Sequence, residues 1–335
     1  MEMESIIESK SEQLLLRAHH FGAADIHLMP QEHQYSVCFR KYGQLIPAGD
    51  MTDDIAQRLI SYFKYLSSLD IGEKRKPQSG AFAQVLEEIP YAFRVSTLPS
   101  SYSKESVAIR LLRQNYARSL QELCYKPAQA EVLTTFMETR QGLLLFCGAT
   151  GSGKTTTLYS LLRHGGTALS RHVISLEDPV ESNQEHILQI QVNERAGITY
   201  ASGLKAILRH SPDIIMIGEI RDHATAHIAL EAALTGHLVV ATIHAKDAVN
   251  CLYRLVDFGL SIDELRQVLL AVASQILVEV AEDERKALFE LLAGAQLKEA
   301  LQAIGHNKSF ELPLAATLQG QLTQLKVGHY VHRSS

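Results

Sequence analysis

The sequence has few of the features that are typical of secreted proteins, membrane-spanning proteins or proteins stabilised by a structural metal site. Its four cysteines, Cys38, Cys124, Cys147 and Cys251, are far apart and form no C-x-x-C pair, which argues against disulfides and cysteine zinc sites. No apolar stretch reaches the roughly 18 residues that a membrane-spanning helix requires; the longest, residues 268–280, is interpreted as a buried helix. The acidic start differs from a secretory signal. We therefore expect a cytoplasmic protein.

A basic excess is also absent. The formal net charge is −5 and the isoelectric point is near 6.3. A surface that neutralises many phosphates of a nucleic acid usually carries an excess of lysine and arginine. Direct binding of nucleic acid is therefore not expected.

The 335 residues are enough for two domains of ordinary size. Alternating strand patterns and two helical patterns, over residues 5–20 and 52–69, predict a small mixed α/β domain over residues 1–115. A weakly patterned stretch, residues 116–127, is interpreted as a linker. Residues 128–335 are expected to form the second domain, with a helical region after about residue 250.

Short apolar runs alternate with helical patterns in the second domain. The runs cover residues 143–147, 173–176, 214–217 and 238–243. Continuously apolar strands of this length are typical of a parallel sheet that is covered on both faces. The fold class predicted here is α/β.

A phosphate-binding loop follows the first of these strands. The segment fits G-x-x-x-x-G-K-[ST] and stands between a strand and a helical run, which is the context that this motif requires. Successive backbone N–H groups at a helix N-terminus can wrap phosphates. Lys154 is expected to reach the β- and γ-phosphates and Thr155 to hold Mg²⁺. The predicted nucleotide-binding residues are Gly148, Ala149, Thr150, Gly151, Ser152, Gly153, Lys154, Thr155 and Thr156.

Acidic residues and a histidine follow the other buried strands. Glu219 ends the strand that begins near residue 214, and it is the candidate general base. Because the carboxyl ends of parallel strands meet at one edge of a sheet, these residues should converge on Lys154. The remaining members of the predicted ring around the phosphate are Glu177, Asp178, Glu181 and His244.

A second histidine group has helical spacing. His223, His227 and Glu231 stand at i, i+4 and i+8, a spacing that could bind a metal ion. We favour a solvated or interface face, because neither a cysteine nor another evident ligand accompanies them.

The motifs together resemble the type II secretion and type IV pilus ATPases. The phosphate loop, the acidic box 177–181, the segment 218–222 and the segment 235–244 match the order of that family's Walker A, Asp box, Walker B and His box. The resemblance extends over residues 10–295, and residues 63–80 look most like the Gram-positive competence ATPases. It implies a RecA-like P-loop domain preceded by a small PAS-like domain.

The resemblance carries further expectations. It implies ATP hydrolysis with Mg²⁺, a ring that is a hexamer, and association with a polytopic inner-membrane platform protein at the cytoplasmic face of the membrane. Arg94 and Arg110 match the positions of the family's phosphate-sensing arginines, although arginines on strands are often ordinary surface charges. Many relatives carry a tetracysteine zinc element after the His box, but residues 275–285 contain no cysteine, so no zinc is expected.

Several functions remain open at this stage. A competence pilus motor for DNA uptake is favoured, and a general type II secretion motor or a pilus extension or retraction motor is the alternative within the family. A nucleotide-regulated scaffold that does not hydrolyse ATP is disfavoured by Glu219. A DNA translocase is disfavoured by the acidic net charge.

Overall fold

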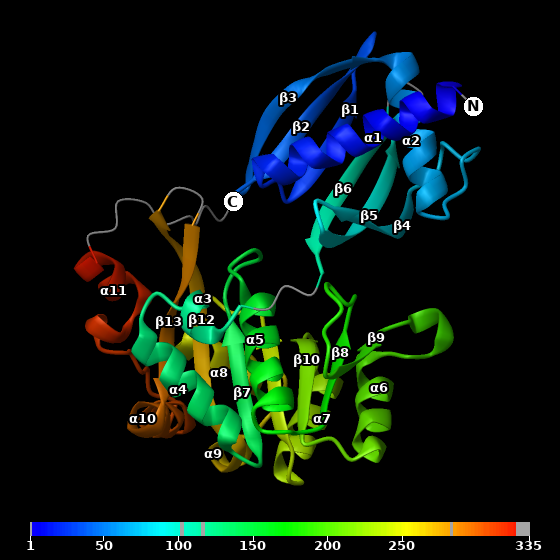
Figure 1. Ribbon diagram of the computed structural model, residues 1–335. Coiled ribbons are helices and arrows are strands. Elements are labelled where there is room, and N and C mark those ends of the chain that lie inside the picture. The colour runs from blue at the N-terminus through cyan, green and yellow to red at the C-terminus, as the bar shows by residue number, and fades with distance from the viewer. Residues whose placement is uncertain (1, 101–103, 115–117, 282–283, 326–335) are drawn as a thin grey trace. The chain divides into compact units, whose positions relative to one another are not determined.

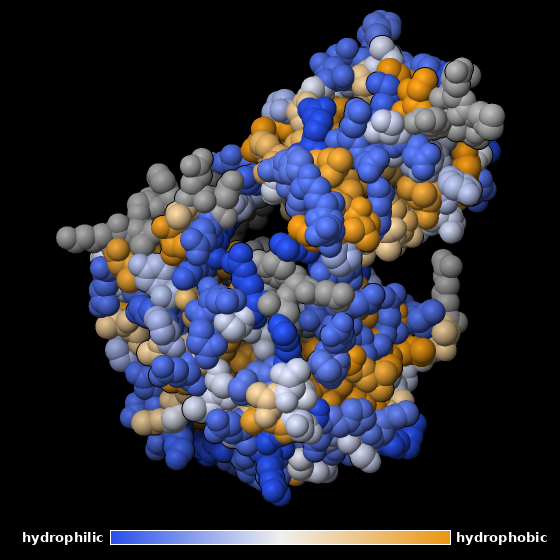
Figure 2. Space-filling view, viewed as in Figure 1, coloured by the Kyte–Doolittle hydropathy of each residue, from blue (hydrophilic) through white to orange (hydrophobic). Residues whose placement is uncertain are grey.

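The computed structural model describes the chain apart from residues 1, 101–103, 115–117, 282–283 and 326–335 (Figure 1). The chain divides into two units, Met1–Tyr116 and Ala117–Ser335. None of the helices in the described part is long and apolar enough to span a membrane. On the visible surfaces, hydrophobic residues form patches among hydrophilic ones (Figure 2).

The first unit is a six-stranded antiparallel sheet with two helices on one face. The strand order is β3-β2-β1-β6-β5-β4. Side chains from both helices, such as Leu15 and Phe63, share one buried cluster with Ile26, Phe93 and Ile109 of the strands. The elements are α1 (Glu2–Phe21), β1 (Asp25–Pro30), β2 (Gln34–Lys41), β3 (Gln44–Thr52), α2 (Asp53–Leu66), β4 (Gln78–Leu86), β5 (Ile89–Pro99) and β6 (Glu105–Arg113).

The second unit is built on a seven-stranded sheet of order β13-β12-β7-β11-β10-β8-β9. All neighbouring strands are parallel except β12 and β13, which are antiparallel. The strands are β7 (Gly142–Cys147), β8 (Val173–Glu177), β9 (Ile187–Gln191), β10 (Ile214–Ile220), β11 (Leu238–Ile243), β12 (Leu269–Ala281) and β13 (Glu284–Ala293). The predicted α/β class with a parallel sheet is confirmed.

Helices cover both faces of this sheet (Figure 1). Along β7, Leu143 and Leu145 enter one buried cluster and Leu144 and Phe146 enter the other, which explains the continuously apolar run. The α-helices are α3 (Leu120–Leu123), α4 (Pro127–Glu138), α5 (Lys154–Thr167), α6 (Tyr200–Ile207), α7 (His223–Leu234), α8 (Ala248–Asp257), α9 (Ile262–Val268), α10 (Gly294–Gly305) and α11 (Leu318–Leu325), with short 3-10 turns at Glu194–Ala196, Leu208–His210 and Leu314–Ala316.

The predicted helical region after residue 250 is wrong in part. Residues 268–280, interpreted as a buried helix, form most of β12, and β13 follows it. Ala273 and Val272 of β12 point into opposite buried clusters. A strand that is buried on both faces shows no alternation, and its 13 residues match the usual length of a helix.

The predicted linker also differs from the structure. Within residues 116–127, α3 already belongs to the second unit, and its first residue, Leu120, is buried there together with Cys124. Ser119 and Glu122 form a capping box that starts the helix. A helix of one turn is too short to produce a periodic apolar pattern.

Candidate functional site

The phosphate loop lies at the carboxyl end of β7, and α5 begins at Lys154 directly after it. Gly148 has φ +140° and Gly153 has φ +85°, both in the region that favours glycine. A Cβ at position 148 would lie 2.5 Å from the backbone oxygen of Gln275. The loop therefore requires glycine both for its backbone conformation and for its contact with β12.

Lys154 folds back onto its own loop. Its Nζ donates hydrogen bonds to the backbone oxygens of Gly148, at 2.8 Å, and Ala149, at 2.9 Å. Burial lowers the pKa of Lys154, while Cys147, Glu219 and Glu181 act in the opposite direction. The ammonium group is thus partly desolvated, and the neighbouring acidic groups favour its charged form.

Gln275 supports the loop from the neighbouring strand β12. Its side chain is completely buried, and its Nε2 donates a hydrogen bond of 2.7 Å to the backbone oxygen of Ser152. Among the described residues, its Oε1 has no hydrogen-bond partner, and neither has the hydroxyl group of Ser152. This contact could not be predicted from the sequence, because Gln275 lies 123 positions from Ser152 in a segment interpreted as a helix.

Glu219 is the centre of a charged cluster at the carboxyl ends of β10, β11 and β8. Arg221 donates a hydrogen bond of 2.5 Å through Nε to one Glu219 oxygen, and His244 Nε2 lies 3.1 Å from the other. Arg221 also reaches Asp178, with 3.4 Å between Nη1 and Oδ2. The structure therefore brings together Glu219, Asp178 and His244, and it adds Arg221, which the sequence analysis had not assigned a role.

Tight packing beneath the cluster fixes the end of β10. The Thr242 hydroxyl group donates a hydrogen bond to the backbone oxygen of Gly218. A Cβ at Gly218 would lie 3.0 Å from the Tyr200 hydroxyl oxygen and 3.2 Å from the backbone oxygen of Leu176. Burial raises the pKa of Tyr200 to about 12, so this hydroxyl group stays protonated beside Glu219.

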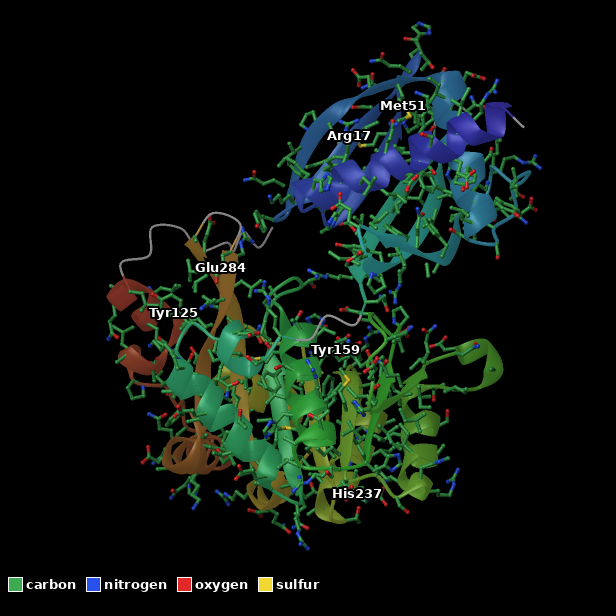
Figure 3. All side chains as sticks on the ribbon, in the orientation of Figure 1. Arg17, Met51, Tyr125, Tyr159, His237 and Glu284 are labelled. Carbon is green, nitrogen blue, oxygen red and sulfur yellow. The ribbon has the colours of Figure 1, made fainter. Side chains whose placement is uncertain are left out.

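Glu177 does not join the exposed cluster. It is 3% exposed and accepts hydrogen bonds from Tyr159, from Ser175 at 2.6 Å and from Gln189 at 3.1 Å. Tyr159 comes from α5 and lies inside the second unit (Figure 3). The hydrogen bonds join α5, β8 and β9, so Glu177 fixes the segment that carries Asp178.

Glu181 and the threonines of the loop differ from Glu177 in exposure. Glu181 is exposed, and its charge acts on Lys154. Thr155 and Thr156 are half-buried in the first turn of α5. Both therefore lie at the N-terminus of the helix that follows the phosphate loop.

Arg94 and Arg110 belong to the first unit. They face each other as direct partners on β5 and β6, so both side chains lie on the sheet face opposite the helices. Arg110 donates a hydrogen bond of 2.8 Å to Asp25, and Arg40 lies 3.8 Å from the same carboxylate. The Arg110 side chain is still 61% exposed, so most of it is open to a further ligand.

The histidine group on α7 forms a packing contact. The rings of His223 and His227 lie 4.0 Å apart between centroids. A Cβ at Gly259 would lie 2.9 Å from the His223 ring, so the pair packs against the turn after α8. His237, another histidine of this unit, precedes β11 at the end of the sheet away from the phosphate loop (Figure 3).

Comparison with known proteins places the chain in a family. The family model described as "Type II/IV secretion system protein" matches residues 1–313. Competence protein ComGA of Bacillus subtilis (strain 168) is 42% identical over 91% of this chain and 90% of its own length. Competence protein ComGA of Halalkalibacterium halodurans is 43% identical over 91% of this chain and 92% of its own length.

Solved structures agree with the fold. The pilus retraction motor PilT, solved with bound ADP, is 26% identical, covers 95% of this chain and 93% of its own, and superposes with a TM-score of 0.71. Together with the phosphate loop and the Glu219 cluster, the likeness extends over both units. The chain belongs to the type II/IV secretion system protein family and is one of its ATPases.

Proposed function

We propose that this chain is the motor that powers assembly of a competence pilus for DNA uptake. The observation that carries the proposal is the convergence of Glu219, Asp178 and His244 at the sheet edge that bears the phosphate loop, in a chain similar to two competence proteins over nine-tenths of their length. Its likeness to a pilus retraction motor with bound ADP supports nucleotide binding.

The loop and its lysine bind ATP in this proposal. The backbone N–H groups of residues 148–156 surround the phosphates at the start of α5, where the helix dipole favours anions. Lys154 leaves the oxygens of Gly148 and Ala149 and turns to the β- and γ-phosphates. The Thr155 hydroxyl group is placed to hold the Mg²⁺ that accompanies ATP and that neutralises charge on the phosphates.

Glu219 orients and deprotonates the attacking water. Arg221 and His244 hold its carboxylate from two sides, so its direction is fixed before the substrate arrives. Asp178 and Glu181 sense the bound phosphate through their interactions with Arg221 and Lys154. Glu177 holds the segment that carries them in place. Arg94 and Arg110 supply guanidinium groups from the other unit, which suit the γ-phosphate oxygens.

The proposal extends to assembly and partners. A ring of six copies, bound at the cytoplasmic face of the membrane to a polytopic platform protein, fits a motor that moves a fibre. Heterologous contacts that close produce such rings. In this proposal ATP hydrolysis requires no zinc, and the mechanism includes no direct binding of nucleic acid.

The test is made in the organism that carries the gene. We expect a chromosomal Glu219→Gln substitution to abolish pilus assembly and uptake of labelled DNA, while protein secretion and growth continue. Loss of protein secretion with intact DNA uptake would identify a general secretion motor instead. Purified protein should release phosphate from ATP; binding without turnover would indicate a scaffold, and turnover stimulated by DNA and suppressed by salt would indicate a translocase.

A further inference from the structure

A group of potential metal ligands lies in the first unit, apart from the nucleotide site. His19, His20 and Glu87 each present a ligand atom, and these atoms lie within 4.8 Å of one another. The two histidines are in the last turn of α1, and Glu87 is in the turn between β4 and β5. Segments far apart in the sequence therefore meet at one point.

The distances in this group fit a metal ion after small side-chain rotations. His20 Nε2 lies 2.7 Å from Glu87 Oε1, and His19 Nε2 lies 3.7 Å from Glu87 Oε2. Zinc–nitrogen and zinc–oxygen bonds of about 2.0–2.2 Å place neighbouring ligand atoms about 3.3 Å apart. The two observed distances end on different oxygens of the Glu87 carboxylate and lie on either side of this value, and the three ligand atoms lie within 4.8 Å of one another.

A hydrogen bond on the far side of the His19 ring orients it for ligation. His19 Nδ1 lies 2.9 Å from the hydroxyl oxygen of Tyr91, which is 8% exposed on β5. When Nδ1 carries the proton and donates it to Tyr91, the lone pair of Nε2 points to Glu87. Metal-ligating histidines usually donate their other N–H in this way.

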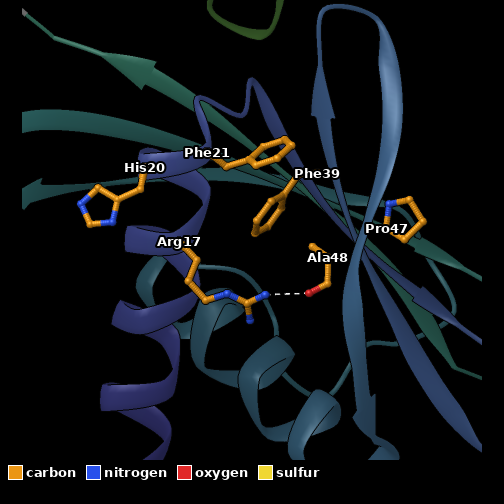
Figure 4. Close-up of a pocket in the computed structure, with 6 residues that line it drawn as sticks. All are labelled: Arg17, His20, Phe21, Phe39, Pro47 and Ala48. Atoms are coloured by element: carbon orange, nitrogen blue, oxygen red, sulfur yellow. Dashed lines mark hydrogen bonds between the residues drawn. The ribbon is translucent and has the colours of Figure 1, made fainter.

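The His20 ring also points toward this group. His20 also lines the pocket of about 570 Å³ beside α1, and Figure 4 shows its ring directed away from Phe39, Pro47 and Ala48, which line the same pocket. Two imidazole nitrogens and one carboxylate oxygen form a donor set for zinc, nickel, cobalt or copper, whereas Mg²⁺ and Ca²⁺ prefer oxygen alone. The C-terminal end of a helix also favours a cation.

We propose that His19, His20 and Glu87 form a binding site for a divalent transition metal, such as Zn²⁺, that ties the end of α1 to the β4–β5 turn. The site is separate from the tetracysteine element of related ATPases and uses none of the cysteines. His20 and Glu87 have side chains that are 59% and 53% exposed, so the bound ion exchanges with solvent and is lost during purification in chelator.

The test is a titration of chelator-treated, full-length protein with ZnCl2 in excess Mg²⁺, followed by calorimetry. We expect one saturable site, which His20→Ala and Glu87→Gln each weaken at least about tenfold. Tyr91→Phe should weaken it by about tenfold, and by less than either ligand variant does, because it removes only the group that orients His19. Co²⁺ should give a visible absorption band that the two ligand variants lose.

The matched control is His33→Ala. His33 is also a histidine beside a glutamate in the first unit, 3.9 Å from Glu32, but its side chain is 88% exposed, and no third ligand joins the pair within the described part of the chain. It should bind zinc as the wild type does. Equal zinc affinity in the wild type and in folded His20→Ala and Glu87→Gln variants, or no saturable binding at all, would overturn the proposal and leave a set of His–Glu ion pairs.

Discussion

The two units use their sheets differently. In the second unit both faces of the sheet are covered by helices, so polar chemistry is confined to the edge where the parallel strands end. In the first unit the helices cover one face, and the other carries Arg40, Arg94 and Arg110 beside Asp25. A covered sheet places functional groups at its strand ends, and a half-covered sheet can place them on its open face.

This contrast predicts separate roles for the two units. The open face of the first sheet should sense the γ-phosphate, and the strand ends of the second sheet should bind and hydrolyse ATP. We expect Arg94→Ala and Arg110→Ala to reduce ATP turnover by roughly 10³–10⁵-fold, as loss of an arginine finger does elsewhere. Affinity for ADP should be nearly unchanged, because ADP has no γ-phosphate. Phosphate release and ADP calorimetry measure the two effects.

The outcomes for the arginines separate function from folding. Turnover at the wild-type rate in both variants would mean that these arginines are structural. Loss of ADP binding would mean that they hold the fold or contact the α- and β-phosphates. Ser96→Ala, on the same open face and exposed, is the control and should leave both measurements unchanged.

The residues at the strand ends of the second unit should also have separate roles, in nucleotide binding and in catalysis. We expect Glu219→Gln to retain nucleotide binding and to lose about 10²–10⁴-fold in turnover, because it acts at the water. Lys154→Ala should lose binding itself, because it removes a phosphate contact. Titration with a fluorescent nucleotide and steady-state phosphate release distinguish them, and an equal loss of binding in both variants would contradict the division of roles.

A smaller effect on nucleotide binding is expected from a substitution on β12, next to the phosphate loop. Gln275→Leu removes the donor to the Ser152 oxygen, which we expect to cost about 1–3 kcal/mol of stability and to weaken nucleotide binding by loosening the loop. Thermal unfolding with and without ADP measures both effects. Ser274→Ala, next to it on β12 and also buried, is the matched control, and an equal loss of ADP affinity in both variants would mean that the loop does not depend on Gln275.

The smallest effect concerns a buried carboxylate near the start of α8. Burial raises the pKa of Glu290, although N–H groups of Ala248 and Leu318 act against the shift. A raised pKa in the folded state means that Glu290 contributes most stability below the ordinary carboxyl pKa and loses that contribution as pH rises through the folded value. Relative to Glu290→Gln, the wild type should therefore become less stable between about pH 4.5 and neutrality.

The measurement for Glu290 is the melting temperature of both proteins across this range. A difference that stays constant, or that moves in favour of the wild type as pH rises, would show that the two N–H donors outweigh burial.

Sequence patterns predicted those parts of the fold in which the local residue pattern matches the environment in the folded protein. The run 238–243 coincides with β11, and the phosphate loop stands between β7 and α5 as its motif requires. They did not predict β12 or the contact of Gln275 with Ser152, since periodicity carries no information about a strand that is buried on both faces. Nor did they show that Glu177 turns inward, because a strand's last residue can point to either side of its end.

The position of Lys154 has a consequence for selectivity. Its ammonium group has two oxygen partners within the loop, so a bound anion must replace these two hydrogen bonds. We expect a triphosphate, which can also engage the N–H groups along the loop, to replace these contacts more favourably than a single phosphate or sulfate ion does.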